Sequence, residues 1–566
     1  MSVLLLSYLV LTGLMGWRLV SVQVVSAAEY RDLADRQVQR TVELPPTRGK
    51  LYDRSGEPLA MSLSAATIYA NPRELREGGV DPTFIAAELA PLLDSSLEEL
   101  MEALTSDTGF TYLARQVPRR VGQRVEAAKL AGVGVLAEPT RVYPAPGLAS
   151  QVIGFAGVDN IGLEGLELSQ DELLAGTPGR LSLERAPQGL EIAHGGRELE
   201  PPVPGTDLVL TLDRQIQATT ESTLTDAVDR YGALGGSAVV MDTDTGEILA
   251  MASTPGFDPS NPRAADPYDR RNRAVTDIFE PGSVNKVIAA AAAMEEGKVW
   301  PDEVFTVPDT WQVGPKEFKD SSPHETESMT FSEIIAKSSN VGTIQVAQRL
   351  EPAVFHDYLT AFGMGRATGL GFPGESRGLL RDPADWWVTD QPAMAIGQSV
   401  SSSLLQMAGV FETIASGGEW VQPSLVRGAV GADGRLRPAA EAERSRVVST
   451  ETAQTLSRML VGVITDGTGE LAAVPGYEVA GKTGTAQKPS EDGGYQEGAY
   501  IATFAGFAPA DDPALVVAVM LDDPTPYYGG LTAAPVFSEI MEFALGHERV
   551  APSDPGARLT ATPAAP

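Results

Sequence analysis

One short segment, residues 280–286, constrains this chain more than any other. It reads E-P-G-S-V-N-K and is followed by an apolar run with five consecutive alanines, residues 289–293. Proline and glycine interrupt regular structure, whereas alanine is the best helix former and needs almost no space. The pattern therefore predicts a helix that begins at Ser283 and is buried among close neighbours. Lys286, three residues later, is expected on the same face as Ser283.

Two interpretations of this Ser-x-x-Lys pair are open from the segment alone. Serine is a favoured N-cap, so Ser283 could simply cap the helix. A capping box, however, has Glu or Gln at the position of Lys286, and a lysine there points its charge at the positive end of the helix dipole. Such a placement would lower the pKa of Lys286. A neutral lysine beside a hydroxyl can serve as the general base for a serine nucleophile.

The composition limits the classes of protein to which the chain can belong. At 566 residues it is too long for one ordinary core, and its contents of hydrophobic (43%) and charged (21%) residues are typical of a globular protein. The formal net charge of −32 opposes binding to nucleic acid. The absence of cysteine excludes disulfides, thiolate metal sites and a cysteine nucleophile. The four histidines lack metal-ligand spacing, so we expect neither a metal nor a cofactor.

The N-terminus predicts a membrane anchor over residues 1–28. Residues 2–17 carry no charge, Arg18 interrupts, and residues 19–28 are again uncharged. A membrane-spanning helix needs about 20 apolar residues, a length that is reached if the Arg18 side chain extends toward the headgroups. The alternative is a cleaved signal peptide with its processing site at residues 25–27. Either interpretation places most of the chain outside the cytoplasmic membrane.

Residues 29–205 predict an N-terminal domain of helices and strands. Residues 29–44 have a polar, helix-compatible pattern, and the sequence D-R-S-G at 53–56 lies between short apolar segments, which indicates a hairpin. From 73 to 135, apolar residues recur at intervals of three and four, so helices are expected. Residues 141–210 are rich in glycine and proline and predict loops and strands with a structural role.

A second domain is expected over residues 206–550. Its pattern predicts a strand at 208–212, a helix at 213–231 and a hairpin around the turn at 242–246. Three further strands and a closing helix are expected at 479–485, 501–507, 514–521 and 534–545. Short links between these last strands favour an antiparallel sheet flanked by helices. The tail, 551–566, is rich in proline and alanine and is expected to be disordered.

Three short motifs stand in a fixed order within this second domain. The pair Ser283 and Lys286 comes first, Ser338-Ser339-Asn340 follows, and Lys482-Thr483-Gly484-Thr485 comes last. Each motif alone is weak, but the set in this order is known from class A β-lactamases and penicillin-binding proteins. The chain resembles the class B penicillin-binding proteins, which are monofunctional peptidoglycan D,D-transpeptidases. It is most similar to their septal, cell-division branch.

The resemblance extends beyond the motifs to nearly the whole chain. It includes the single anchor, the stretch from Arg48 to Ala60, the glycine-rich stretch 162–167 and the turn at 242–246. It implies a multidomain α/β protein with three parts. These are an N-terminal transmembrane helix, an elongated α+β pedestal domain of the dimerisation type, and a penicillin-binding, β-lactamase-like transpeptidase domain whose antiparallel sheet is flanked by helices.

The resemblance also implies catalytic roles for the first two motifs. Ser283 would attack the penultimate D-Ala carbonyl of a stem peptide, with release of the terminal D-Ala, and Lys286 would take its proton. Ser338 would relay a proton to the departing amine. Asn340 would hydrogen-bond the substrate amide and Lys286.

The third motif would bind the substrate. A second ammonium, that of Lys482, would help to keep Lys286 neutral and would attract the terminal carboxylate. The backbone N–H groups of Ser283 and Thr485 would form the oxyanion hole. The substrate-binding residues implied by the resemblance are Thr483, Gly484 and Thr485.

The expected partners also follow from the resemblance. They are D-Ala-D-Ala stem peptides, β-lactam antibiotics that acylate the enzyme, and a polytopic glycan polymerase with other divisome membrane proteins, because class B members lack a polymerase of their own. The expected location is the cell membrane, crossed once, with the catalytic domain outside the cytoplasm. One loop departs from the family pattern: Ser399 stands where glycine is usual, and Ser403-Leu404 where Thr-Pro is usual.

Three other functions were weighed against this one. A β-lactam hydrolase, of class A or class D type, is the nearest, but no asparagine follows Asn340, so the class A deacylation loop is absent in its usual form. Residues 476–483 match the phosphate-binding motif G-x-x-x-x-G-K-[ST], yet no helix is predicted after it, so an ATPase is rejected. A catalytically silent divisome scaffold gains no support, because all the motif residues are present.

Overall fold

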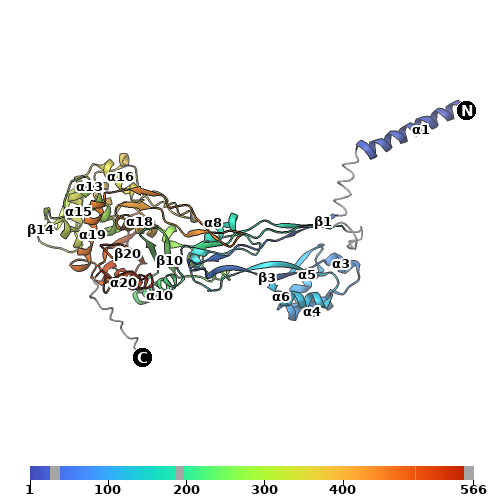
Figure 1. Ribbon diagram of the computed structural model, residues 1–566, viewed down its shortest axis with the longest axis horizontal. Helices are drawn as coiled ribbons and strands as arrows, with labels where there is room; N and C mark the ends of the chain where they lie inside the picture. The colour runs from blue at the N-terminus through green and yellow to red at the C-terminus, as the bar shows by residue number, and fades with distance from the viewer. Residues whose placement is uncertain (26–38, 185–196, 491–492, 554–566) are drawn as a thin grey trace. The chain divides into compact units, whose positions relative to one another are not determined.

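The structure, a computed structural model, describes residues 1–25, 39–184, 197–490 and 493–553 (Figure 1). The chain divides into two compact units. The first unit comprises residues 1–49, 62–140 and 175–205, and the second comprises residues 50–61, 141–174 and 206–566. The expected disorder of the tail lies outside the described residues from position 554 onward. Both units therefore draw on residues before 206.

The first unit begins with an apolar helix, α1 (Ser2–Val20), which continues into a π-helix at Ser21–Val25. The span Val3–Gln23 is long and apolar enough to cross a membrane, by length and composition alone, and none of it is buried in the protein. The predicted anchor is thus matched by a helix of the required length. A signal sequence passes the same test, so the choice between the two stays a prediction.

A small α/β core lies in the same unit. Its helices are α3 (Pro72–Glu77), α4 (Pro82–Leu93), α5 (Leu97–Thr105) and α6 (Arg119–Ala128), and its strands are β3 (Pro58–Ala70), β4 (Thr111–Pro118) and β5 (Val133–Val142). Apolar side chains such as Ile68, Leu89 and Leu100 share one cluster. The helices predicted over 73–135 are confirmed except at β4 and at 133–135, where β5 begins. Both strands form because β3 offers them a partner.

One prediction for this unit was wrong. Residues 39–44 are not helical but form strand β1 (Gln39–Leu44), and the rest of the segment, 29–38, lies outside the described residues. Strand β1 pairs antiparallel with β6 (Gly179–Glu184), which in turn pairs with β7 (Arg197–Glu200). The partner strand follows about 140 residues later in the chain, so the local pattern could not reveal it.

The second unit is built on a five-stranded antiparallel sheet. The strand order is β10–β9–β21–β20–β19, with bounds β9 (Gly235–Asp242), β10 (Ile248–Thr254), β19 (Ala480–Pro489), β20 (Tyr495–Ala508) and β21 (Leu515–Asp522). The predicted hairpin and three later strands are thereby confirmed, β19 and β20 being longer than expected. Because β19 is a strand with no helix after it, the phosphate-binding interpretation of residues 476–483 is excluded.

Helices cover both faces of this sheet. On one face, α10 (Arg214–Tyr231) packs on β10 and α20 (Gly529–His547) packs on β20, while α18 (Leu404–Ala415) packs on β21 from the other (Figure 1). Alternate residues of one strand accordingly join different clusters: Val240 of β9 packs with α10 and α20, whereas Val239 packs with α18. Asp213 caps α10 by accepting from the backbone N–H groups of its first turn, which confirms the predicted helix start.

Smaller elements complete the second unit. The predicted hairpin at 53–56 is confirmed, because β2 (Leu51–Tyr52) pairs with the start of β3 and Asp53 closes the turn by accepting from the N–H groups of Ser55 and Glu57. The remaining strands are β8 (Leu208–Leu210), β11 (Val304–Val307), β12 (Thr310–Val313), β13 (Lys316–Lys319), β14 (Glu327–Thr330), β15 (Glu419–Val421), β16 (Val426–Val430), β17 (Leu436–Pro438) and β18 (Arg444–Arg446). The remaining helices are α7 (Ser150–Ile153), α8 (Gly165–Ser169), α9 (Asp171–Leu174), α11 (Pro267–Arg270), α12 (Arg273–Thr276), α13 (Lys286–Glu295), α14 (Phe331–Ala336), α15 (Asn340–Ala347), α16 (Pro352–Ala361), α17 (Asp390–Ala395) and α19 (Thr450–Thr465).

The alanine-rich helix α13 is buried as the sequence predicted. Every residue from Lys286 to Ala293 is buried, and α13 contacts α15, α16, α17 and α19. Larger side chains at the alanine positions would hold these neighbours apart. The alanines therefore allow the helix that carries Lys286 to lie at the centre of the domain.

The packing of α13 can be tested with Ala291→Leu. Ala291 is fully buried, so the added atoms must displace neighbours, and we expect the free energy of unfolding to fall by about 1–3 kcal/mol. Ala353→Leu is the matched control on the exposed surface of α16 and should change it by less than about 0.5 kcal/mol. Urea unfolding followed by tryptophan fluorescence measures both. Equal midpoints for the two variants would contradict the described burial.

Candidate active site

The segment around Ser283 is shaped by a glycine. Residues Gly282–Asn285 form a 3₁₀ turn that leads into α13, and Gly282 has a φ of +58°, a conformation that favours glycine. A Cβ atom added there would lie 3.0 Å from the carbonyl oxygen of Thr485. The turn therefore sits directly against strand β19. No side-chain cap hydrogen bond occurs at either helix start, so the structure does not support capping as the role of Ser283.

Lys286 joins the first motif to the second. Its side chain is fully buried, and its Nζ donates to the carbonyl oxygen of Ser338 at 2.6 Å and to Oδ1 of Asn340 at 2.7 Å. The hydroxyl oxygen of Ser338 lies 3.3 Å from the same Nζ. The contact with Asn340 is the one that the resemblance implied, whereas the contacts with Ser338 were not predicted.

Burial lowers the pKa of Lys286 to about 7, and the nearby carboxylate of Asp320 acts against this shift. The direction agrees with our expectation, although the main cause is burial and not the helix dipole. The pKa of Lys482 is likewise held well below its usual range, chiefly by burial and further by Lys286. The hydrogen-bond acceptors around Lys286 are stronger than those around Lys482. Lys286 is therefore the ammonium when only one of the two lysines is charged.

The second motif is held by its own backbone and by a loop. Ser338 has a φ of +61°, and Ser339 caps α15 by accepting from the N–H of Gly342 at 2.9 Å. The amide group of Asn340 is fixed on both sides, because Oδ1 accepts from Lys286 and Nδ2 donates to the carbonyl oxygen of Lys319 at 2.9 Å. Its orientation is therefore determined before any ligand binds.

The third motif lies on β19, beside the Ser283 turn. Lys482 is fully buried, and its Nζ lies 3.4 Å from both the carbonyl and the hydroxyl oxygen of Thr483. The hydroxyl of Thr483 also pairs with that of Thr468 at 2.6 Å, and the hydroxyl oxygen of Thr485 accepts from the N–H of Gly529 at 3.1 Å. These contacts orient both threonine hydroxyls.

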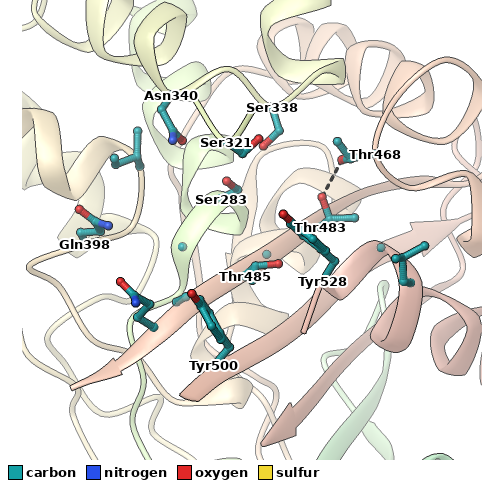
Figure 2. Close-up of a pocket in the computed structure, with 17 residues that line it drawn as sticks. Ser283, Ser321, Ser338, Asn340, Gln398, Thr468, Thr483, Thr485, Tyr500 and Tyr528 are labelled. Atoms are coloured by element: carbon teal, nitrogen blue, oxygen red, sulfur yellow. Dashed lines mark hydrogen bonds between the residues drawn. The ribbon is translucent and has the colours of Figure 1, made fainter. Parts of the chain in front are cut away.

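A cleft of about 460 Å³ brings the three motifs together. Figure 2 shows Ser283 between the second motif and strand β19. Ser338, Asn340, Thr483, Gly484 and Thr485 line the cleft, whereas the two lysines are fully buried and are not among its lining residues. All eight residues predicted for the site are therefore close to one another.

Several lining residues were missed from the sequence. Thr468 lies in the run D-G-T-G, Tyr528 and Gly530 open α20, Tyr500 lies on β20, and Ser321 and Gln398 lie in loops. The glycine-rich turns around Thr468 and Gly529 were signals that could have been used. A Cβ atom at Gly529 would lie 2.3 Å from the carbonyl oxygen of Gly484, so only glycine lets α20 approach β19 this closely.

The loop that departs from the family pattern keeps a conformation suited to glycine. Ser399 has a φ of +60°, in the left-handed region, so a serine occupies a strained position where glycine is usual. Its backbone N–H donates to Oε1 of Glu280 at 2.8 Å, and Oε2 of Glu280 accepts from the hydroxyl of Tyr495 at 2.8 Å. Ser403, in the second departing position, caps α18. The departures thus leave the motif residues in place.

One group of described side chains has ligand atoms close enough for a metal ion: Asp213, His547 and Glu548, all within 4.8 Å of one another. Its carboxylates already have partners. Asp213 caps α10 and lies 3.1 Å from Nε2 of His547, and Glu548 lies 3.4 Å from Arg54. None of these residues lines the cleft, so we assign the group to the structure and not to the chemistry.

Comparison with known proteins decides the family. The model of the penicillin binding protein transpeptidase domain matches residues 236–542, and that of the penicillin-binding protein dimerisation domain matches residues 43–210. The chain belongs to the class B penicillin-binding proteins. Its second unit therefore contains a transpeptidase domain, and the chain is an enzyme of that class.

Relatives match this family member over nearly its whole length. The penicillin-binding protein PbpB of Mycobacterium tuberculosis is 39% identical, over 97% of this chain and 85% of its own. The peptidoglycan D,D-transpeptidase FtsI of Escherichia coli is 34% identical, over 95% of this chain and 89% of its own. A crystal structure of penicillin binding protein 3 from M. tuberculosis, complexed with ampicillin, is 34% identical, covers 91% of this chain and 98% of its own, and has a TM-score of 0.72.

The burial of Lys286 predicts a specific pH dependence of stability. Its pKa is about 7 in the folded protein and near the usual 10.5 when unfolded, so between these values the unfolded chain binds more protons and the free energy of unfolding rises with pH. From pH 7 to pH 9 the wild type should gain about 2 kcal/mol relative to Lys286→Met, as measured by urea unfolding. Lys337→Met, at an exposed lysine, should follow the wild type. Parallel curves for wild type and Lys286→Met would show that Lys286 titrates normally.

Proposed function

We propose that this enzyme crosslinks peptidoglycan stem peptides by serine acyl transfer, with release of the terminal D-Ala. The observation that carries the proposal is the buried Lys286, whose Nζ contacts Ser338 and Asn340 behind the cleft that Ser283 lines. The similarity to a relative named as a peptidoglycan D,D-transpeptidase supports the substrate class.

The first half of the proposed reaction forms an acyl-enzyme. Oγ of Ser283 bonds to the penultimate D-Ala carbonyl carbon while its proton passes to Nζ of Lys286. The peptide C–N bond then breaks, its electron pair goes to the leaving nitrogen, and Ser338 relays a proton to that nitrogen. The N–H groups of Ser283 and Thr485 are the proposed donors to the developing oxyanion.

The third motif is proposed to bind the terminal carboxylate and to prepare the base. A carboxylate next to Lys482 stabilises its ammonium form, so substrate binding favours a proton on Lys482 and a neutral Lys286. The hydroxyls of Thr483 and Thr485, already oriented by Thr468 and Gly529, are positioned to donate to the same carboxylate. In the second half of the reaction, the amine of a neighbouring stem attacks the acyl carbon, the bond from that carbon to Oγ of Ser283 breaks, and the proton that the amine loses passes to Oγ.

The same cleft is proposed to react with β-lactams. These drugs present an amide carbonyl and a carboxylate to the same groups, and a relative of this fold is known in complex with ampicillin. A hydrolase would need a group that activates water for deacylation, and no feature of the described cleft favours one. A silent scaffold is disfavoured because the motif residues are brought together.

Labelling with a fluorescent penicillin tests this function. The full-length wild type should form a stable adduct that persists for hours, whereas Ser283→Ala should form none, because it lacks the nucleophile. Ser260→Ala, at an exposed serine of the same unit outside the cleft, is the matched control and should label like the wild type. Rapid loss of label with drug turnover would indicate a hydrolase. No label on folded wild type would leave only the scaffold.

The membrane context is part of the proposal. We propose that α1 crosses the membrane once and holds the catalytic unit outside the cytoplasm, where stem peptides occur, and that the enzyme acts at the septum with a polytopic glycan polymerase and other divisome membrane proteins. The apolar span Val3–Gln23 supports the first point. The similarity to the relative named FtsI over 95% of the chain supports the septal branch.

Exchange of the anchor tests whether the anchor and the first unit bind the polymerase. Replacement of Ser2–Val20 by an unrelated apolar helix should keep the enzyme in the membrane and keep its penicillin labelling, while co-purification of the polymerase falls at least several-fold. A second variant that lacks residues 1–60 should lose co-purification completely. Equal recovery of the polymerase with all three proteins would remove the idea that the anchor and the first unit bind it.

A further inference from the structure

A buried carboxylate outside the three motifs holds the second motif in place. Asp320 follows strand β13, and its side chain is 8% exposed. Its Oδ1 accepts from the backbone N–H groups of Asn340 at 2.5 Å and Val341 at 3.0 Å, and its Oδ2 accepts from the hydroxyl of Ser339 at 2.7 Å. One carboxylate thus contacts the motif at two points and the residue after it at a third.

His324 holds this carboxylate from the other side. Its Nε2 lies 3.1 Å from Oδ2 of Asp320, and its Nδ1 lies 2.6 Å from the carbonyl oxygen of Glu325. Both ring nitrogens face oxygen acceptors, and only the imidazolium form can donate from both. The pKa of His324 is accordingly raised, first by the Glu325 carbonyl and then by Asp320, with a smaller effect of Glu327.

Asp320 is connected through Asn340 to Lys286, the proposed general base. Asn340, whose backbone Asp320 holds, accepts from Nζ of Lys286 through Oδ1, and Lys319, the residue before Asp320, holds the other end of the same amide. Two charged groups act on Lys286 among the described residues: Lys482 from β19 and Asp320 from this loop. Asp320 is the one that opposes the effect of burial.

We propose that Asp320, supported by His324, is a positioning residue of the transpeptidase: it fixes Asn340 and Ser338 against Lys286 and places a negative charge behind the general base. The inference rests on the proposed function of Ser283 and Lys286. A purely structural cap is the simpler alternative. Against it, Asp320 does more than pair with the first-turn N–H groups that Ser339 does not reach: it also accepts from the hydroxyl of Ser339, and its charge acts on Lys286.

The test is the variant Asp320→Asn in the full-length chain. The amide keeps the shape and one acceptor, but it loses the charge and cannot accept from Ser339 at its nitrogen. We expect the second-order rate constant for labelling by fluorescent penicillin to fall at least tenfold. We also expect the acid limb of its pH profile to move to lower pH, because loss of the carboxylate lets the pKa of Lys286 fall further.

Asp309→Asn is the matched control. Asp309 accepts from the backbone N–H of His324 at 3.3 Å but does not contact the second motif, so this variant should keep the wild-type rate and pH profile.

A slower Asp320→Asn with an unmoved acid limb would assign Asp320 a structural role only, and an unchanged rate would overturn the proposal outright. If Asp320→Asn does not fold, His324→Gln decides, with an expected loss of about threefold in rate; a wild-type rate would then overturn the proposal. A wild type that is not labelled at Ser283 would instead contradict the proposed function itself.

Discussion

The site depends on one buried ammonium. Lys286 lies fully inside the domain, and its three contacts are all to residues of the second motif, Ser338 and Asn340. A lysine is costly to bury, and a protein keeps one in such a place when the site needs an amine that is neutral near physiological pH. The surrounding structure serves this constraint: an alanine-rich helix brings the lysine to the centre, and the strand β19 closes the other side.

The glycines of the site serve the same constraint. Three segments far apart in the chain must approach within van der Waals distance, and side chains at the contact points would prevent it. A Cβ atom at Gly397 would lie 2.0 Å from the carbonyl oxygen of Gly282, and one at Gly484 would lie 2.2 Å from the hydroxyl of Thr503. Such close approaches fix the shape of the cleft.

The electrostatics of the cleft arise from a balance of few groups. Burial lowers the pKa of both Lys286 and Lys482, so the two lysines together carry less than two positive charges. Asp320 adds a negative charge that acts on Lys286. In the proposed reaction, a substrate carboxylate near Lys482 favours a neutral Lys286, so that binding of the donor would be linked to activation of the nucleophile.

The sequence by itself determined the elements that carry the chemistry. The spacing of the three motifs, the buried alanine helix, the hairpin at 242–246 and the antiparallel sheet were all predictable, because each depends on local pattern or on a motif order with few alternatives. Only the tertiary structure decided the rest. Strand β1 forms in place of a helix because it pairs with β6, a partner too far along the chain for the local pattern to reveal. Thr468 and Asp320 contact the site only through the tertiary fold. The depth at which Lys286 lies, and hence its pKa, is likewise a property of packing that no local pattern contains.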